Sequence, residues 1–155
     1  MSGRVLARLA ELGLELPAVA APVAAYVPAV PDGDHVWVSG QLPFVDGVLP
    51  VVGQVGDGEG LVAPDVAAAQ AARCALNAVA ALAGVADLDR VRIVKVTGFV
   101  AVAPGFTAIP AVINGASTLL GDVFGEAGRH ARAAVGVAAL PLGAPVEVEL
   151  VARLG

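Results

Sequence analysis

The first hydrophobic segments of the chain are short and interrupted, a pattern typical of β-strands. Residues 26–30 and 35–40 have strand-like composition, and the sequence PDGD separates them with a glycine that can adopt a positive φ. We therefore expect these two segments to form a β-hairpin. A third short strand is expected at residues 48–52.

Two helices and a long strand are predicted in the middle of the chain. Pro64 lies where a proline favours the first turn of a helix, and Gly84 marks the end of the apolar stretch that follows. Residues 91–103 predict a strand, which a Pro-Gly pair then ends. A second helix is expected at residues 109–124, with Pro110 in its first turn and a glycine beyond its end.

The end of the chain predicts a second hairpin, formed by residues 132–140 and 146–151. In the second of these strands Glu147 and Glu149 alternate with aliphatic residues, so both glutamates face one side of the sheet. The element order βββαβαββ predicts a single α+β domain over residues 1–155. We expect two helices to pack on one face of a mixed, six-stranded sheet.

The composition is apolar for a domain of 155 residues. Hydrophobic residues make up 57% and charged residues 15%, whereas typical domains have about 45–50% and about 25%. A monomer with so little charge would expose apolar patches, so we expect identical copies to cover them in a closed oligomer. Prolines interrupt the uncharged segments 16–31 and 97–113, which excludes an unbroken membrane-spanning helix in either.

Charge and cysteine content narrow the possible partners. Lys and Arg total 9 against 14 acidic residues, and the basic residues are scattered, so no nucleic-acid-binding surface is expected. Cys74 is expected to be a small buried residue. His35 and His130 lie far apart without further ligands at metal-binding spacing, so no metal site is expected. The N-terminus lacks the apolar stretch of a secretion signal, and we expect a soluble cytoplasmic protein.

Arg132 is the most informative side chain for function. It begins a segment of small apolar residues that carries no other charge until Glu147. A guanidinium group keeps its proton, and taking it out of water is costly unless an anion meets it. Either a protein carboxylate or a ligand can supply that anion, and the guanidinium fork suits a planar carboxylate.

The predicted hairpin also constrains where such a ligand would bind. Glu147 lies close to the turn and Arg132 at the far end of the partner strand, roughly 15–20 Å away at about 3.3 Å per residue. One small ligand cannot reach both side chains of one chain. We therefore expect a cleft between subunits, where Arg132 of one chain meets Glu147 of its neighbour.

Two sequence motifs carry a resemblance to a known family. SGQLP at residues 39–43, which follows Tyr26, and ARAAV at residues 131–135, which leads through Leu-Pro to VEVE, resemble the reactive intermediate deaminase family. This family is also called RidA or YjgF, and formerly L-PSP endoribonuclease. The resemblance begins at about residue 22 and leaves residues 1–21 as an N-terminal extension. It implies a trimer of chorismate-mutase-like subunits whose sheets line a central barrel, with clefts between neighbouring chains.

The resemblance also implies an activity and a set of site residues. Members of the family hydrolyse reactive 2-imino and enamine acids to 2-keto acids and ammonia, and they need no cofactor. By position, Arg132 corresponds to the carboxylate-binding arginine, and Glu147 to the acid that positions or activates water. The other implied positions, which line the substrate cleft, are Tyr26, Ser39, Gly40, Asn114 and Ala134.

This chain departs from the founding branch of that family close to Arg132. Ala134 stands where that branch usually has cysteine, and Gly136 where it has a larger, often acidic residue. The change at Ala134 is expected to be tolerated, because that position mainly supplies backbone, whereas the change at Gly136 is expected to alter the cleft and its substrate preference. The preceding residues Arg129 and His130 are expected to face solvent or to screen the mouth of the cleft.

Other functions and other roles for these residues stay open. The same cleft suits a non-catalytic keto-acid-binding or regulatory protein, whereas RNA cleavage, the older family label, fits poorly with a net charge of −5. Arg132 could form an ion pair across the trimer, with Glu147 as its partner or as a solvated residue. Tyr26 could be a packed core or interface residue, Ser39 could bond the backbone, and Asn114 could shape a helix.

Overall fold

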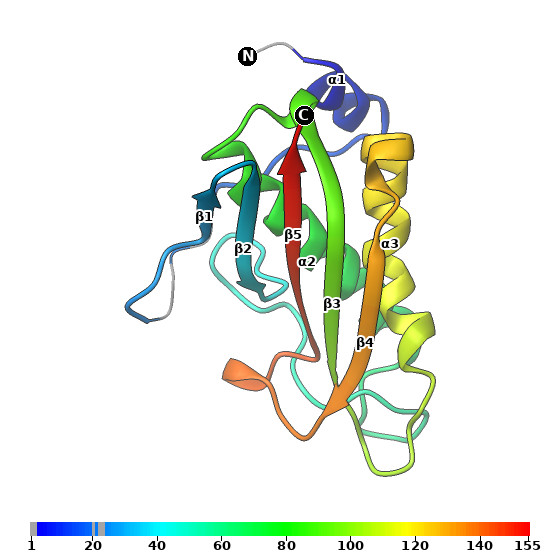
Figure 1. Ribbon diagram of the computed structural model, residues 1–155. Coiled ribbons are helices and arrows are strands. Elements are labelled where there is room, and N and C mark those ends of the chain that lie inside the picture. The colour runs from blue at the N-terminus through cyan, green and yellow to red at the C-terminus, as the bar shows by residue number, and fades with distance from the viewer. Residues whose placement is uncertain (1–2, 20, 22–23) are drawn as a thin grey trace.

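The computed structural model describes residues 3–19, 21 and 24–155, and it shows one sheet with helices on one side (Figure 1). The α-helices are α1 (Arg4–Glu11), α2 (Pro64–Ala83) and α3 (Ile109–Phe124), and the short 3-10 helices are η1 (Leu88–Arg90), η2 (Gly125–Gly128) and η3 (Pro141–Gly143). The strands are β1 (Ala29–Asp32), β2 (His35–Gln41), β3 (Val91–Ala101), β4 (Ala131–Val137) and β5 (Val146–Leu154). The sheet order is β1-β2-β5-β3-β4, and only the β3–β4 pair is parallel. The predicted α+β class with a mixed sheet is confirmed.

One face of the sheet packs against α2 and α3 and forms the core. Buried positions alternate along the strands, as a sheet with one covered face requires. They are Val36 and Val38 in β2, Ile93, Val96 and Val100 in β3, and Val146, Val148, Leu150 and Ala152 in β5. In Figure 1 α2 lies behind the sheet, α3 lies behind and beside β4, α1 lies at one end of the fold, and the face turned to the viewer is uncovered. On that uncovered face, Val30, Trp37 and Val135 are 48%, 55% and 42% exposed.

Local signals set the ends of the two long helices as predicted. Helix α2 starts at Pro64 and ends before Gly84. Proline is tolerated at this start because an N–H group in the first turn would have no acceptor within the helix. Helix α3 has Pro110 in its first turn and ends at Phe124, just before Gly125, whose φ of 61° favours glycine. Helix α2 has 20 residues, and an 18-residue stretch of it has a mean hydropathy of 1.4, enough to cross a membrane, yet 61% of that stretch is buried inside the fold. Helix α2 is therefore the core helix of the fold, packed against the sheet and α3.

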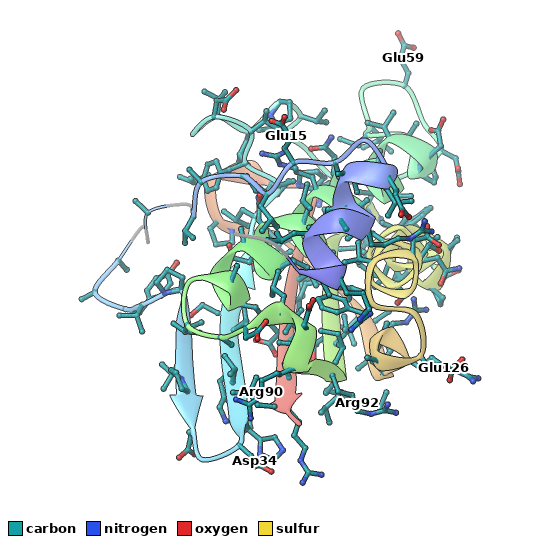
Figure 2. All side chains as sticks on the ribbon, turned by 90° about the horizontal axis from the view of Figure 1, so that it is seen from above. Glu15, Asp34, Glu59, Arg90, Arg92 and Glu126 are labelled. Atoms are coloured by element: carbon teal, nitrogen blue, oxygen red, sulfur yellow. The ribbon has the colours of Figure 1, made fainter. Side chains whose placement is uncertain are left out.

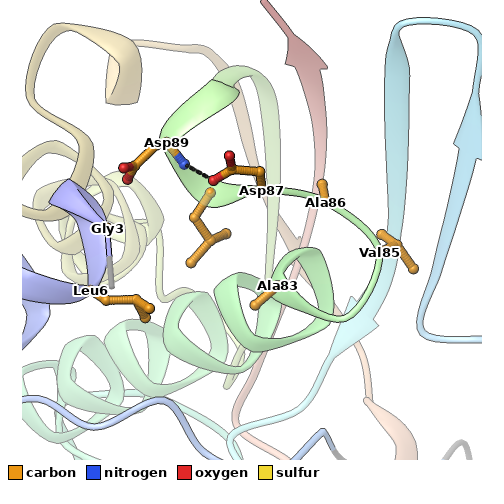
Figure 3. Close-up of a pocket in the computed structure, with 8 residues that line it drawn as sticks. Gly3, Leu6, Ala83, Val85, Ala86, Asp87 and Asp89 are labelled. Atoms are coloured by element: carbon orange, nitrogen blue, oxygen red, sulfur yellow. Dashed lines mark hydrogen bonds between the residues drawn. The ribbon is translucent and has the colours of Figure 1, made fainter. Parts of the chain in front are cut away.

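Helix α1 was not predicted, and it packs at one end of the fold. Its buried residues Val5 and Leu9 lie one turn apart. Asp89 from η1 caps this helix, because its carboxylate accepts from the backbone N–H groups of Arg4 and Val5, both at 2.8 Å. The bonds from Val5 and Arg4 hold the pKa of Asp89 below its ordinary value. Figure 3 shows the hollow of about 500 Å³ beside this contact, where the carboxylate of Asp87 accepts from the N–H of Asp89 at 3.0 Å.

The predicted hairpin at the end of the chain is wrong. Strand β4 pairs in parallel with β3, to which α3 connects it, and β5 lies on the other side of β3. The N–H of Ala101 bonds to the carbonyl of Pro145, and that of Val102 to the carbonyl of Val137. The end of β3 therefore separates the two segments that the short connection appeared to join. A helical crossover allows the parallel pairing that a tight turn cannot make.

The sixth strand, predicted at residues 48–52, is also wrong. Val45 and Val48 bond to each other's backbone in one isolated pair, and Asp46 and Gly47 between them have φ values of 50° and 78°. This tight turn is not extended, and Pro50 has no N–H for a strand ladder. The sheet therefore has five strands, and the described residues form three α-helices instead of two.

Charged side chains lie on the outside of the fold. In Figure 2 the labelled side chains of Asp34, Arg92 and Glu126 lie at the periphery. The Nε group of Arg153 donates to the Asp34 carboxylate at 2.8 Å, and this bond lowers the pKa of Asp34. Both side chains are solvent-exposed, so the pair contributes little to stability. The two charged residues predicted for the site, Arg132 and Glu147, lie in β4 and at the start of β5.

Candidate functional site

Arg132 lies on the outer strand of the sheet, with its side chain against helix α3. It pairs with the buried Val96 of β3, so both side chains point toward the helices. Its Nη1 group donates to Oδ1 of Asn114 at 2.8 Å and to Oγ of Ser117 at 3.2 Å. Its Nη2 group donates to the carbonyl of Pro110 at 3.4 Å. Three neutral acceptors on one helix thus hold the guanidinium in place.

The charge of this guanidinium has no counterion within the described part of the chain. The ion pairs of those residues involve other side chains, and none includes Arg132. Because this unpaired charge is half-buried, an anion bound beside it would offset the cost of removing the guanidinium from water. The Nε proton and one Nη2 proton have no acceptor among the described residues, and adjacent donors of this kind can bind both oxygens of a carboxylate.

A second hydrogen-bonded layer supports Arg132. Ser117 lies within 2.9 Å of Nε2 of His130, and Nδ1 of His130 lies 2.6 Å from the carbonyl oxygen of Gly128. Ser117, His130 and Arg132 line an open hollow of about 340 Å³, together with Gly121, Gly128 and Arg129. The ring of His130 therefore bonds within the fold while it lines the hollow beside Arg132, and the side chain of Arg129 is solvent-exposed.

Glu147 lies at the start of β5 on the uncovered face of the sheet. It pairs with Phe99, whereas its neighbours Val146 and Val148 point into the core. Burial raises the pKa of Glu147, and the charge of Glu149 on the same face raises it further. A Cβ atom added at Gly40 would lie 2.9 Å from Cδ of Glu147 and closer still to Oε1. Gly40 therefore lacks a side chain where the Glu147 carboxylate lies.

Ser39 lies next to Gly40 in β2, and Tyr26 lies in the segment that leads into β1. The Ser39 hydroxyl donates to the carbonyl of Val27 at 2.6 Å, and its N–H donates to the carbonyl of Pro28 at 2.9 Å. These bonds hold the segment after Tyr26 against β2, where the pairing of β2 with β5 shifts register. Tyr26 itself is 45% exposed. Ser39 thus has the backbone-bonding role that the sequence left open, and Tyr26 has an accessible ring.

The predicted site residues form two separate groups within one chain. Arg132 and Asn114 lie together at β4 and α3, with Ala134 two residues further along β4. Glu147 lies beside Gly40. Arg132 pairs with Val96 and Glu147 with Phe99, so the two site residues lie two strands apart and three residues apart along β3. At standard strand spacings their Cα atoms are therefore about 14 Å apart. The two side chains also point to opposite faces of the sheet.

The space beside Gly136 is filled by other residues of the chain. An added Cβ would lie 2.9 Å from Cδ1 of Ile109 and 3.0 Å from Cγ2 of Val102. Gly136 therefore does not open additional room next to Arg132. The start of α3 occupies the space that a larger side chain would need.

Sequence reasoning named Asn114 as a site residue but missed the contacts that Pro110 and Ser117, also on α3, make with Arg132. Pro110, Asn114 and Ser117 follow one another at intervals of four and three residues, so they share one face of α3. A polar stripe at this spacing on an apolar helix was the available signal. The contact with Arg132 depends on β4 lying beside α3, which no local pattern reveals.

The described residues contain no cluster suited to a metal ion, and Cys74 is buried. Among the described residues, no three His, Cys, Asp or Glu side chains lie close enough together to hold a metal ion. Cys74 is fully buried, and burial raises the pKa of its thiol well above the ordinary value, with a smaller contribution from the charge of Glu147. The thiol is protonated and inaccessible, as expected for a core residue.

The fold and these contacts define a class of protein, an α+β subunit with a half-buried arginine at the edge of its sheet. The chain belongs to the family described as "YjgF/chorismate_mutase-like, putative endoribonuclease", whose model matches residues 6–154. It is 51% identical to Protein TCP17 of Trypanosoma cruzi, over 99% of this chain and 96% of that protein.

Solved structures show the same fold. The protein Atu1372 of Agrobacterium tumefaciens, of unknown function, is 42% identical with a TM-score of 0.87, over 98% of this chain and 93% of that one. A protein of Shewanella oneidensis MR-1, described as a putative endoribonuclease, is 34% identical with a TM-score of 0.91, over 97% and 99%. The resemblance seen in the motifs is thereby confirmed at the level of the family. The matched region also includes most of α1.

Proposed function

We propose that this protein is a cytoplasmic deaminase that hydrolyses reactive 2-imino acids to 2-keto acids and ammonia. The observation that carries the proposal is the Arg132 guanidinium, which three neutral acceptors orient and which has two adjacent donors left for a carboxylate. A 2-imino acid presents such a carboxylate beside an electrophilic C=N carbon. Bidentate binding would place that carbon at a defined distance from the arginine.

Glu147 has the properties required of the group that handles protons. Hydrolysis requires a water molecule beside the imine carbon and proton transfer toward the departing ammonia. A carboxyl group whose pKa is raised by burial exchanges protons closer to neutral pH than an ordinary glutamate does. A protonated imine is already activated, so the reaction as proposed needs no cofactor.

The proposal includes a homotrimer in which Arg132 of one subunit and Glu147 of the next share a cleft. Two features support this assembly. The uncovered face of the sheet exposes Trp37, Val30 and Val135, and burial of apolar side chains drives association. Strand β4, which carries Arg132, is an edge of the sheet within one chain. Another subunit at this edge could bring its Glu147 to the arginine.

The test uses 2-iminopropanoate or 2-iminobutanoate generated by an amino-acid oxidase, and it follows the release of keto acid. We expect the wild-type chain to exceed the uncatalysed rate and Arg132→Ala to lose about ten- to a hundredfold in kcat/KM, as for a lost charge-assisted contact. Arg132→Lys should recover little, because lysine cannot form the planar fork. Arg92→Ala, which removes the same charge from an exposed position of β3, is the matched control.

Two outcomes would change the assignment. A wild-type rate equal to the uncatalysed rate for several imines, together with retained keto-acid binding, would identify a non-catalytic binding or regulatory protein. RNA cleavage that survives Arg132→Ala and responds steeply to salt would favour the endoribonuclease description of the family. The net charge of −5 argues against that second outcome.

A further inference from the structure

We infer that His130 is a positioning residue that orients the Arg132 guanidinium through the hydroxyl of Ser117. The inference rests on the proposed function, because it concerns the same anion site, and it adds a residue that the family motif does not include. His130 lies in the segment between η2 and β4, and Ser117 lies on α3. The two residues join the wall of the hollow that Arg132 also lines.

The direction of each hydrogen bond in this chain follows from what each group can donate. The carbonyl oxygen of Gly128 only accepts, so Nδ1 of His130, at 2.6 Å, carries the proton. In the neutral ring Nε2 is then an acceptor. Arg132 only donates, so Oγ of Ser117 must accept from its Nη1 group at 3.2 Å. The proton of the Ser117 hydroxyl is thereby directed to Nε2 of His130, at 2.9 Å.

His130 matters because the Ser117 hydroxyl has an alternative. A serine inside a helix can turn and donate to the backbone carbonyl four residues earlier, here that of Ile113. Because Nε2 of His130 accepts the Ser117 hydroxyl proton, that proton points away from Arg132 and a lone pair of the Ser117 oxygen points toward it. Without that acceptor, Arg132 loses one of the three contacts that orient its fork. The carboxylate would then bind a less ordered guanidinium.

Binding of 2-oxobutanoate, a stable keto acid, tests this role by calorimetry. We expect His130→Ala to weaken binding by about three- to tenfold, as for one lost neutral hydrogen bond. His130→Gln should restore most of the affinity, because its side-chain oxygen can accept from Ser117. The double variant Ser117→Ala/His130→Ala should bind no more weakly than Ser117→Ala alone. His35→Ala, at the β1–β2 turn, is the matched histidine control and should bind as the wild type does.

Wild-type affinity in His130→Ala, or additive losses in the double variant, would overturn the inference. If the wild-type chain neither binds keto acid nor hydrolyses imines, the proposed function fails, and nitrogen NMR still decides the positioning role. With two histidines in the chain, we expect His130 in the tautomer protonated at Nδ1. We also expect the Arg132 Nε resonance to move in His130→Ala but not in His130→Gln or His35→Ala. An Nε2-protonated His130, or an unmoved Arg132 signal, would refute it.

Discussion

Gly40→Ala should displace the carboxylate of Glu147, the group proposed to handle protons, while leaving the fold intact. The new Cβ would lie 2.9 Å from Cδ of Glu147 and nearer to Oε1, and real Cβ atoms almost never approach closer than 3.0 Å. The glutamate is the side that can yield, because its carboxylate is the end of a flexible side chain. The backbone at Gly40 is not in the left-handed region, so alanine itself fits there.

The size of the effect follows from that displacement. Relief of the contact requires a shift of the carboxylate by about 1 Å, and misplacement on this scale can reduce catalysis about a hundredfold. We therefore expect kcat for imine hydrolysis to fall by about that factor, which corresponds to about 2.7 kcal/mol in the activation barrier. Thermal stability should change little, because removing a glycine also lowers the entropy of the unfolded chain.

The assay compares keto-acid release by the wild type, Gly40→Ala, Glu147→Ala and the double variant. If Gly40→Ala acts through Glu147, it should lower the residual rate of Glu147→Ala by no more than about twofold. A full hundredfold loss in both backgrounds would mean that Gly40 contributes in another way. Wild-type kcat in Gly40→Ala would refute the role assigned to the position of this carboxylate.

The raised pKa of Glu147 and the helix contact at Gly115 give three further predictions. The acid limb of the kcat/KM profile should lie above the pH at which an ordinary glutamate titrates, and Glu147→Gln should abolish that limb. A carboxyl group whose pKa is raised in the folded state lowers the stability of the protein as pH rises. Glu147→Gln should therefore be more stable than the wild type near neutral pH and lose this advantage below the ordinary glutamate pKa. Denaturation measured at a series of pH values checks this. Gly115→Ala should cost about 1–3 kcal/mol in urea denaturation, because its Cβ would lie 2.7 Å from the carbonyl carbon of Ala68 in α2. Gly121→Ala in the same helix meets nothing within 4 Å and should be neutral or stabilising by up to about 1 kcal/mol, so equal effects of the two substitutions would contradict the close packing of α2 on α3.

Elements that depend on local signals could be predicted from the sequence. A proline in the first turn and a glycine at the end set α2 and α3, because the chain needs no distant partner to satisfy those preferences. Helix α1 was missed for the opposite reason. Its N-terminal cap is the carboxylate of Asp89, which is far away in sequence.

Strand order could not be predicted, because neighbours in a sheet need not be neighbours in sequence. The connection after β4 is short enough for a hairpin, yet α3 had already brought β4 alongside β3. Strand β5 then enters the remaining place between β2 and β3, where its buried valines meet the core. The alternation of valine and glutamate in β5 correctly indicated which side faces the core, although not which strands lie beside it.

The residues of the candidate site divide along the same line. Arg132 was found because charge is scarce around it and because the family motif includes it. Ser117 and His130 were not, because their contact with Arg132 exists only when α3 and the segment after η2 lie against β4. The chemical character of a single residue can be predicted from the sequence, whereas the side chains that another element brings into contact with it cannot.

The separation of Arg132 and Glu147 within one chain leads to a test of the shared cleft. Arg132→Ala and Glu147→Gln subunits should each be strongly impaired alone, yet mixed assemblies would contain interfaces that pair an intact arginine with an intact glutamate. With equal amounts of the two variants, about half of the subunits keep each residue, so about a quarter of the interfaces in a closed ring have both. Co-refolding or co-expression should therefore recover about a quarter of the wild-type rate of keto-acid release. A site formed within one chain predicts no recovery, since every subunit lacks one of the two groups, and that result would exclude the proposed inter-subunit cleft.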